Sequence, residues 1–129
     1  MLTPIESIES SLYECSDNRS MTISPTSLQY PPLSLYVHIP WCIRKCPYCD
    51  FNSHTFDHDI PENEYIMALI EDLRSEQPHI NGRKLTSIFF GGGTPSLLSG
   101  SAIESIIDAA NTIIGFAPDI EITLEANPG

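Results

Sequence analysis

Basic side chains are scarce in this 129-residue chain: six Lys and Arg residues stand against 17 Asp and Glu residues, and the net charge is −11. So few cations cannot neutralise many phosphates, which excludes most simple nucleic-acid binding proteins. No apolar run approaches the roughly 20 residues that a membrane-spanning helix needs. A secretory signal is lacking, and residues 1–18 contain no Lys or Arg, unlike an organellar transit peptide. We therefore predict a soluble cytoplasmic protein with no nucleic-acid partner and no transmembrane segment.

The N-terminal part of the chain differs in composition from the rest. Residues 1–32 combine Ser, Thr, Pro and acidic residues, and they end at Pro31-Pro32, a pair that cannot continue a helix. We expect this segment to be a flexible leader. Residues 33–39 then alternate between apolar and polar side chains, which predicts a β-strand. A folded domain is therefore expected over residues 33–129.

Two segments carry apolar residues at helical spacing. The first helix is expected to begin at Pro61, whose fixed φ suits a first helical turn, and to end before Pro78. The second has Ser101 and Glu104 as a capping box, and Gly115 stands where a C-terminal cap belongs. Both segments are therefore predicted to be amphipathic helices that cover a sheet.

Further strands are predicted over residues 85–90 and 121–125, so the order is βαβαβ and the fold class is α/β with parallel strands. The first and third strands each have a polar face, which includes Tyr36, His38 and Glu125. A barrel-like sheet explains such faces, because its inner face lines a wet cavity. An edge strand with one solvated face is the alternative.

The chain ends at Asn127-Pro128-Gly129, directly after the third predicted strand. Three strand-and-helix units cannot close a barrel, and the last strand would keep an unpaired backbone edge. We therefore expect residues 33–129 to be an incomplete domain whose remainder is missing. Alone, such a fragment is expected to fold poorly because apolar faces stay uncovered.

Three of the four cysteines fall within eight residues, as Cys42, Cys46 and Cys49. In a reducing cytosol such a cluster indicates metal or redox chemistry rather than disulfides. Three thiolates suit an iron–sulfur cubane with one open iron, since a complete cubane takes four. The alternatives are a simple thiol cluster and a zinc site completed by His54 or His58, although the second cysteine pair typical of zinc sites is absent.

The cysteine spacing resembles the signature of the radical S-adenosylmethionine (SAM) superfamily, Cys-x3-Cys-x-aromatic-Cys on the loop after the first barrel strand, with Tyr48 as the aromatic residue. Further similarity lies in the segments LYVHIPWC, GGGTPS and LEANPG. These segments are similar to the oxygen-independent coproporphyrinogen III oxidases and to the related HemW family of haem chaperones. The resemblance covers about residues 32–129. It implies the N-terminal half of a radical SAM partial (β/α)6 TIM-like barrel.

The resemblance also implies two cofactors, a 4Fe-4S cluster and SAM. Cys42, Cys46 and Cys49 would each bind one iron, and the amino and carboxylate groups of SAM would bind the fourth. The implied SAM contacts are Tyr36, Tyr48, Gly92, Gly93, Thr94 and Glu125. The glycines have a physical rationale of their own, because residues without a Cβ let backbone groups approach a ligand closely. A tight strand-to-helix turn is the plainer alternative.

Phe51 separates two functions within this subgroup. The porphyrinogen oxidases carry a further cysteine two residues after the third motif cysteine, where this sequence has Phe51. The resemblance therefore favours a haem chaperone over an oxidase that decarboxylates propionates, and a zinc-binding interaction module is the third alternative. Whether the protein is an enzyme stays open. The implied partners are haem or porphyrin, a haem acceptor protein, and an electron donor such as a flavodoxin or ferredoxin, with the haem site beyond Gly129.

Overall fold

The computed structural model of the protein describes residues 29–55 and 59–127. The leader predicted over residues 1–32 therefore lies almost entirely outside the described residues. Within the described ranges, none of the helices has the length and apolar character needed to cross a bilayer.

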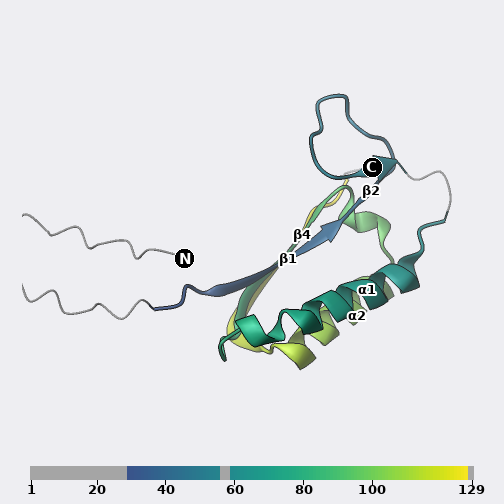
Figure 1. Cartoon of the computed structure of the whole chain (residues 1–129). Helices are drawn as coiled ribbons and strands as arrows, with labels where there is room; N and C mark the ends of the chain where they lie inside the picture. Colours follow the sequence, from purple (N-terminus) through teal and green to yellow (C-terminus); the bar gives the residue numbers. More distant parts are fainter. Residues whose placement is uncertain (1–28, 56–58, 128–129) are drawn as a thin grey trace, which may run out of the picture.

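Three parallel strands form the main sheet, in the order β1, β4, β5: β1 (Leu33–Ile39), β4 (Leu85–Gly92) and β5 (Phe116–Leu124) (Figure 1). The predicted βαβαβ order along the chain and the parallel pairing of these strands are confirmed. β5 begins earlier than the predicted Glu121, and its ladder with β4 is irregular up to that residue. Pro118 lies in the irregular part and has no N–H to donate, so regular alternation starts only after it.

Two helices cover one face of this sheet, α1 (Glu62–Ser75) and α2 (Gly100–Ile113), and they lie side by side (Figure 1). Short 3-10 turns, η1 (Gln77–His79) and η2 (Pro95–Leu97), follow α1 and β4. Burial of apolar side chains between sheet and helices holds the layers together. The buried core consists of Val37, Ile39, Ile66, Leu85, Ile88, Phe90, Leu98, Ala102, Ile106 and Ala110.

The caps of α2 are partly as predicted. Gly115 has φ +87° and its N–H bonds to the Ala110 carbonyl at 3.2 Å, so the predicted C-terminal glycine is confirmed. The predicted capping box at Ser101 is wrong, because Ser99 is the N-cap and its hydroxyl accepts the Ala102 N–H at 3.1 Å. Glu62 explains the choice: its carboxylate accepts the Ser99 N–H at 2.6 Å and the Ser99 hydroxyl at 2.8 Å.

The other face of the sheet carries no helix among the described residues (Figure 1). Tyr36, Phe89 and Thr123 share one row of the register across the three strands, and the Tyr36 and Phe89 rings are stacked with centroids 6.1 Å apart. Their neighbours in the next row, Val37 and Phe90, are buried beneath the helices. The predicted alternation of β1 is therefore confirmed, with Tyr36 on the helix-free face.

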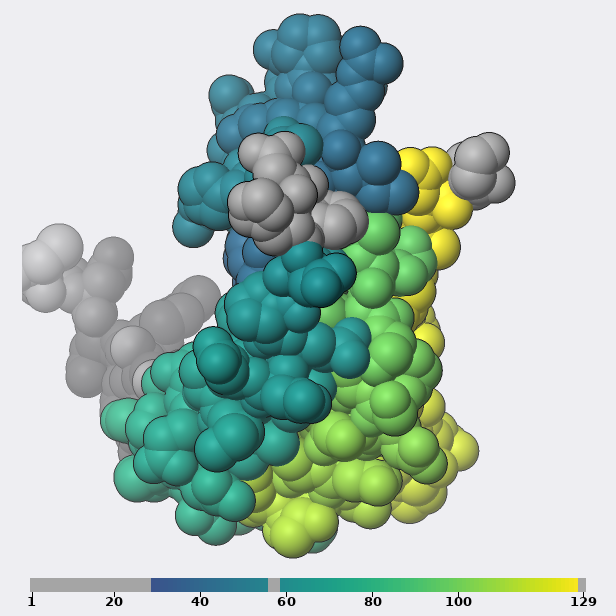
Figure 2. Space-filling model, turned by 90° about the vertical axis from the view of Figure 1, so that its right-hand side faces the viewer, coloured from purple at the N-terminus to yellow at the C-terminus, as the bar shows by residue number. Residues whose placement is uncertain are grey.

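A second, very small sheet was not predicted. β2 (Trp41–Cys42) pairs in parallel with β3 (His54–Thr55), and the His54 N–H bonds to the Pro40 carbonyl at 2.7 Å. We call residues 41–55, which comprise β2, β3 and the segment between them, the cysteine loop. It projects from one end of the main sheet as a separate lobe (Figure 2).

Candidate metal centre

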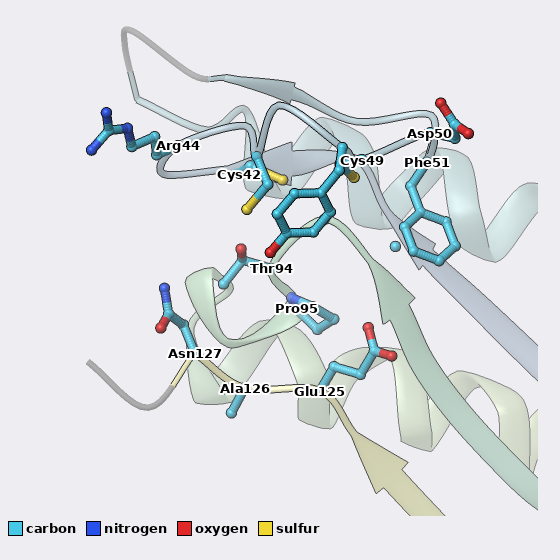
Figure 3. A pocket seen from close by; sticks show the side chains of 14 residues that line it. Cys42, Arg44, Cys49, Asp50, Phe51, Thr94, Pro95, Glu125, Ala126 and Asn127 are labelled. Atoms are coloured by element: carbon cyan, nitrogen blue, oxygen red, sulfur yellow. The ribbon is translucent and has the colours of Figure 1, made fainter.

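A cavity of about 880 Å³ lies between the cysteine loop and the carboxyl ends of β4 and β5 (Figure 3). This volume is within the range of small-molecule and cofactor sites. Three segments of the chain line it: residues of the cysteine loop, the turn after β4, and the residues that follow β5. The lining residues are Cys42, Arg44, Cys46, Tyr48, Cys49, Asp50, Phe51, Gly92, Gly93, Thr94, Pro95, Glu125, Ala126 and Asn127.

All three predicted cluster ligands line this one cavity. Cys42 is buried at the end of β2, Cys49 is half-buried and Cys46 is exposed, and none of the three is in a disulfide. The Cys49 N–H bonds to the Cys46 carbonyl at 3.1 Å, so a turn holds these two residues together. Cys15 lies outside the described residues.

The three thiols are the type of donor that holds an iron–sulfur cluster. Among the described residues, no group of three or more His, Cys, Asp or Glu side chains is arranged to hold one metal ion. In a cubane each thiolate binds a different iron, so the sulfur atoms stand around the cluster instead of meeting at one point. His54, predicted as a possible zinc ligand, is exposed on β3, and His58 lies outside the described residues. The three thiol donors therefore fit a 4Fe-4S cluster.

The glycine turn after β4 is held close against the cysteine loop. The Gly93 N–H bonds to the Ile39 carbonyl at 2.6 Å, and the Thr94 N–H bonds to the Trp41 carbonyl at 2.7 Å. A Cβ on Gly93 would lie 2.3 Å from the Trp41 oxygen and 3.0 Å from the Cys42 Sγ. Glycine is needed here for close contact between two segments of the protein, whereas the sequence led us to expect close contact with a ligand. Thr94 itself lines the cavity with Gly92 and Gly93.

Glu125 lies just beyond the end of β5, on the side of the cavity opposite Cys42 and Cys49 (Figure 3). Its N–H bonds to the Phe90 carbonyl at 3.1 Å, which continues the β4–β5 ladder by one residue. Two residues later, the Asn127 N–H bonds to the Ser96 hydroxyl at 3.4 Å. The chain after β5 is thereby held along the cavity wall.

Charges of both signs line the cavity, with Asp50 and Glu125 as carboxylates and Arg44 as the cation. In Figure 3 the Arg44 guanidinium extends away from the other labelled side chains, so its charge lies at the rim. Tyr48 is 87% exposed, and a hydrogen bond with the Cys46 side chain, followed by the negative charge of that thiolate, raises the pKa of its phenol. Tyr48 therefore stays protonated at neutral pH.

Tyr36 is the one predicted SAM contact that does not line this cavity. Its ring lies further back on the helix-free face, stacked on Phe89, and its hydroxyl is 3.2 Å from the His38 Nδ1. His38 Nε2 in turn lies 2.7 Å from the Asn52 carbonyl oxygen. Tyr36 is therefore linked to the cysteine loop through His38.

Several residues of the site were not found from the sequence. Asp50, Pro95, Ala126 and Asn127 line the cavity, although all four stand within the stretch that carried the family resemblance. From its positive charge alone, Lys45 would be expected to attract an anionic ligand. In the structure, its ammonium donates to the Ser53 carbonyl at 3.2 Å. No periodicity signals a contact between two loop residues eight positions apart.

The comparisons with known proteins agree with this geometry. A profile of the radical SAM superfamily matches residues 36–129. The "Heme chaperone HemW" of Escherichia coli (strain K12) is 51% identical over 102 residues, which make up 79% of this chain and 27% of that protein. The "Heme chaperone HemW" of Haemophilus influenzae is 56% identical over 103 residues, covering 77% of this chain and 27% of the relative.

A solved structure is similar as well, that of "Coproporphyrinogen III oxidase (HemN) from Escherichia coli is a Radical SAM enzyme". The TM-score is 0.68 and the sequence identity 33%, over 75% of this chain and 22% of that chain. The present chain spans about a quarter of the length of the curated relatives that it matches. The superfamily profile covers most of the chain, including the three loop cysteines, the glycine turn and the end of β5. The chain therefore belongs to the radical SAM superfamily.

Proposed function

We propose that this chain holds a 4Fe-4S cluster and SAM in the cavity beside the cysteine loop, and that the protein is a haem chaperone of the HemW type. One observation carries the cofactor part of the proposal. Eight of the nine site residues predicted from the sequence line the same cavity, although they come from three separate segments of the chain. Membership of the radical SAM superfamily implies the same two cofactors.

Cys42, Cys46 and Cys49 are the proposed cluster ligands, because thiolates are the protein ligands of such clusters. In the superfamily, a bound cluster of this kind supplies one-electron chemistry at SAM. The protein's own contribution is to hold both groups in place. Burial of Cys42 at the end of β2 fixes one ligand, and the turn between Cys46 and Cys49 fixes the spacing of the other two.

SAM carries a carboxylate together with amino and sulfonium cations, so it needs partners of both signs. Glu125 and Asp50 offer carboxylates, and the Thr94 hydroxyl and the Tyr48 phenol offer hydrogen bonds, all in the lining of the same cavity. Gly92 and Gly93 add no side chains to this lining. We propose Tyr36 as an indirect contributor that supports His38 beneath the cysteine loop, with its hydroxyl 3.2 Å from the His38 Nδ1.

Phe51 supports the chaperone over the oxidase. Its side chain lines the cavity at the position where, by the family resemblance, the oxidases have a further cysteine. The two relatives described above, which are named as haem chaperones, are 51% and 56% identical to this chain. The proposal includes haem or porphyrin as ligand, a haem acceptor protein, a flavodoxin or ferredoxin as electron donor, and a cytoplasmic location.

Iron and sulfide analysis of the full-length protein, reconstituted without oxygen, tests the cluster. Cys42→Ser, Cys46→Ser and Cys49→Ser are each expected to lose most of the bound iron, because each removes one of three protein ligands. Cys15→Ser is the matched control and is expected to keep it. Full iron content in a loop variant, or an electron paramagnetic resonance (EPR) signal that SAM leaves unchanged, would contradict the proposed site.

Haem titration and porphyrinogen turnover, measured on the same full-length preparation, separate the two functions. A chaperone is expected to bind haem stoichiometrically and to release it to an acceptor apoprotein, with no decarboxylation of coproporphyrinogen III. Turnover of coproporphyrinogen III without haem binding would assign the oxidase function instead.

A further inference from the structure

The return limb of the cysteine loop, residues 51–54, is held by side chains from outside it. His38 Nε2 lies 2.7 Å from the Asn52 carbonyl oxygen, and the Lys45 ammonium donates to the Ser53 carbonyl at 3.2 Å. The carbonyls of two consecutive residues are therefore bound, one by His38, which precedes Cys42 in the sequence, and one by Lys45, which follows it. Ser53 is 1% exposed, so this part of the limb is fixed in the interior of the loop.

The surroundings of Lys45 differ from those of its neighbour Arg44. Lys45 lies between Cys42 and Cys46, directly before the second ligand, and its contact crosses the loop to a residue beyond Cys49. The neighbouring Arg44 lines the cavity, whereas Lys45 does not. The two adjacent cations therefore face different environments, and the ammonium of Lys45 is bound to the loop's own backbone.

We propose that Lys45 is a positioning residue, whose ammonium joins the two limbs of the cysteine loop and so holds the three cysteines in place before the cluster binds. The proposal rests on the proposed function for its consequence at the cluster. Its structural part, the link from Lys45 to Ser53, does not require a cluster. Without the link, the return limb keeps the contact from His38 to the Asn52 carbonyl but loses the contact that ties it to the limb carrying Lys45 and Cys46.

Lys45→Met in the full-length protein removes the ammonium and keeps the length of the side chain. Lys45→Arg restores a donor at the same position and is expected to rescue. Lys84→Met is the matched control, since the Lys84 ammonium also donates to a backbone carbonyl, that of Ile114 at 3.5 Å, at the far end of α2.

The first measurement uses cluster-free protein and hydrogen–deuterium exchange of the amides of residues 46–54. Lys45→Met is expected to speed this exchange about tenfold, the effect of losing one charge-assisted hydrogen bond. The other two variants are expected to exchange like the wild type. Equal exchange in wild type and Lys45→Met would overturn the proposal.

The second measurement uses reconstituted protein and follows the release of iron to a chelator, together with the EPR signal of the reduced cluster with and without SAM. Lys45→Met is expected to release iron about tenfold faster, because a loosened loop no longer holds its thiolates together. If exchange increases but wild-type protein never binds iron, the cluster proposal fails while the link from Lys45 stands. If exchange increases and iron release is unchanged, the link exists but does not position the ligands, and the proposal fails.

Discussion

Replacing Gly93 by alanine tests how closely the cysteine loop and the glycine turn must approach each other. A Cβ at this position would lie 2.3 Å from the Trp41 oxygen, 2.7 Å from the Trp41 carbonyl carbon and 3.0 Å from the Cys42 Sγ. Two of these three atoms are backbone atoms of β2, which cannot rotate out of the way. The turn and β2 must therefore move apart, and Cys42 moves with them.

Two contributions set the expected size of the effect. Overpacking a close contact destabilises a protein by about 1–3 kcal/mol. The bonds from the Gly93 N–H to Ile39 and from the Thr94 N–H to Trp41 cross the same gap, and weakening them costs about 1 kcal/mol. Together they predict that Gly93→Ala lowers the free energy of unfolding by about 3 kcal/mol.

The assay is urea unfolding of the full-length protein, combined with iron analysis after reconstitution. Gly100→Ala is the matched control, because a Cβ on Gly100 meets nothing within 4 Å and the residue is exposed in the first turn of α2. This control is expected to match the wild type or to gain up to about 1 kcal/mol. Wild-type stability and iron content in Gly93→Ala would refute the close fit between the turn and the loop.

Two further variants test contacts that support the site. Glu62→Gln is expected to lower the free energy of unfolding by about 1–2 kcal/mol, because the Glu62 carboxylate accepts two hydrogen bonds from Ser99. In urea unfolding, Ser99→Ala is expected to cost a similar amount and the double variant less than the sum; full additivity would show that the contact contributes nothing. Burial, and next the charge of Tyr36, raise the pKa of Tyr65, whose hydroxyl bonds to the His38 carbonyl. A phenol with a raised pKa stabilises the folded protein below pH 10, and this contribution to the free energy of unfolding is lost as the pH rises above that value. Tyr65→Phe is therefore expected to flatten the decline of stability at high pH. If the dependence of stability on pH is the same in Tyr65→Phe and wild type, the assignment is disproved.

The α/β fold could be predicted because its strands and helices carry strong local signals. The alternation of β1 and the helical spacing of α1 and α2 are properties of neighbouring residues, and the structure retains both. The start of β5 could not be predicted, because Pro118 interrupts the alternation and the ladder with β4 has no paired residues between Phe116 and Glu121. The N-cap of α2 was predicted wrongly for a similar reason, because the Ser99 N–H bonds to the carboxylate of Glu62, which is far away in the sequence at the start of α1.

The residues of the candidate site also fall into two groups, those with a signal in the sequence and those without one. Cys42, Cys46 and Cys49 could be found because their spacing is local, and Gly92, Gly93 and Glu125 came from the family resemblance. The link from Lys45 to Ser53 joins residues whose relation depends on how the loop closes, and loop closure leaves no periodic pattern in the sequence.

By the family resemblance, position 51 distinguishes this chain from the porphyrinogen oxidases inside the cavity itself. Phe51 lines the same space as the three cysteines and is 63% exposed, so a cysteine there would place a fourth thiol among the other three. Phenylalanine instead presents an apolar ring that neither binds iron nor donates a hydrogen atom from sulfur. In Figure 3 the ring extends from the cysteine loop, and Glu125 lies below it on the opposite side of the cavity. A single side chain therefore changes the chemistry of the cavity while leaving the three cysteines in place.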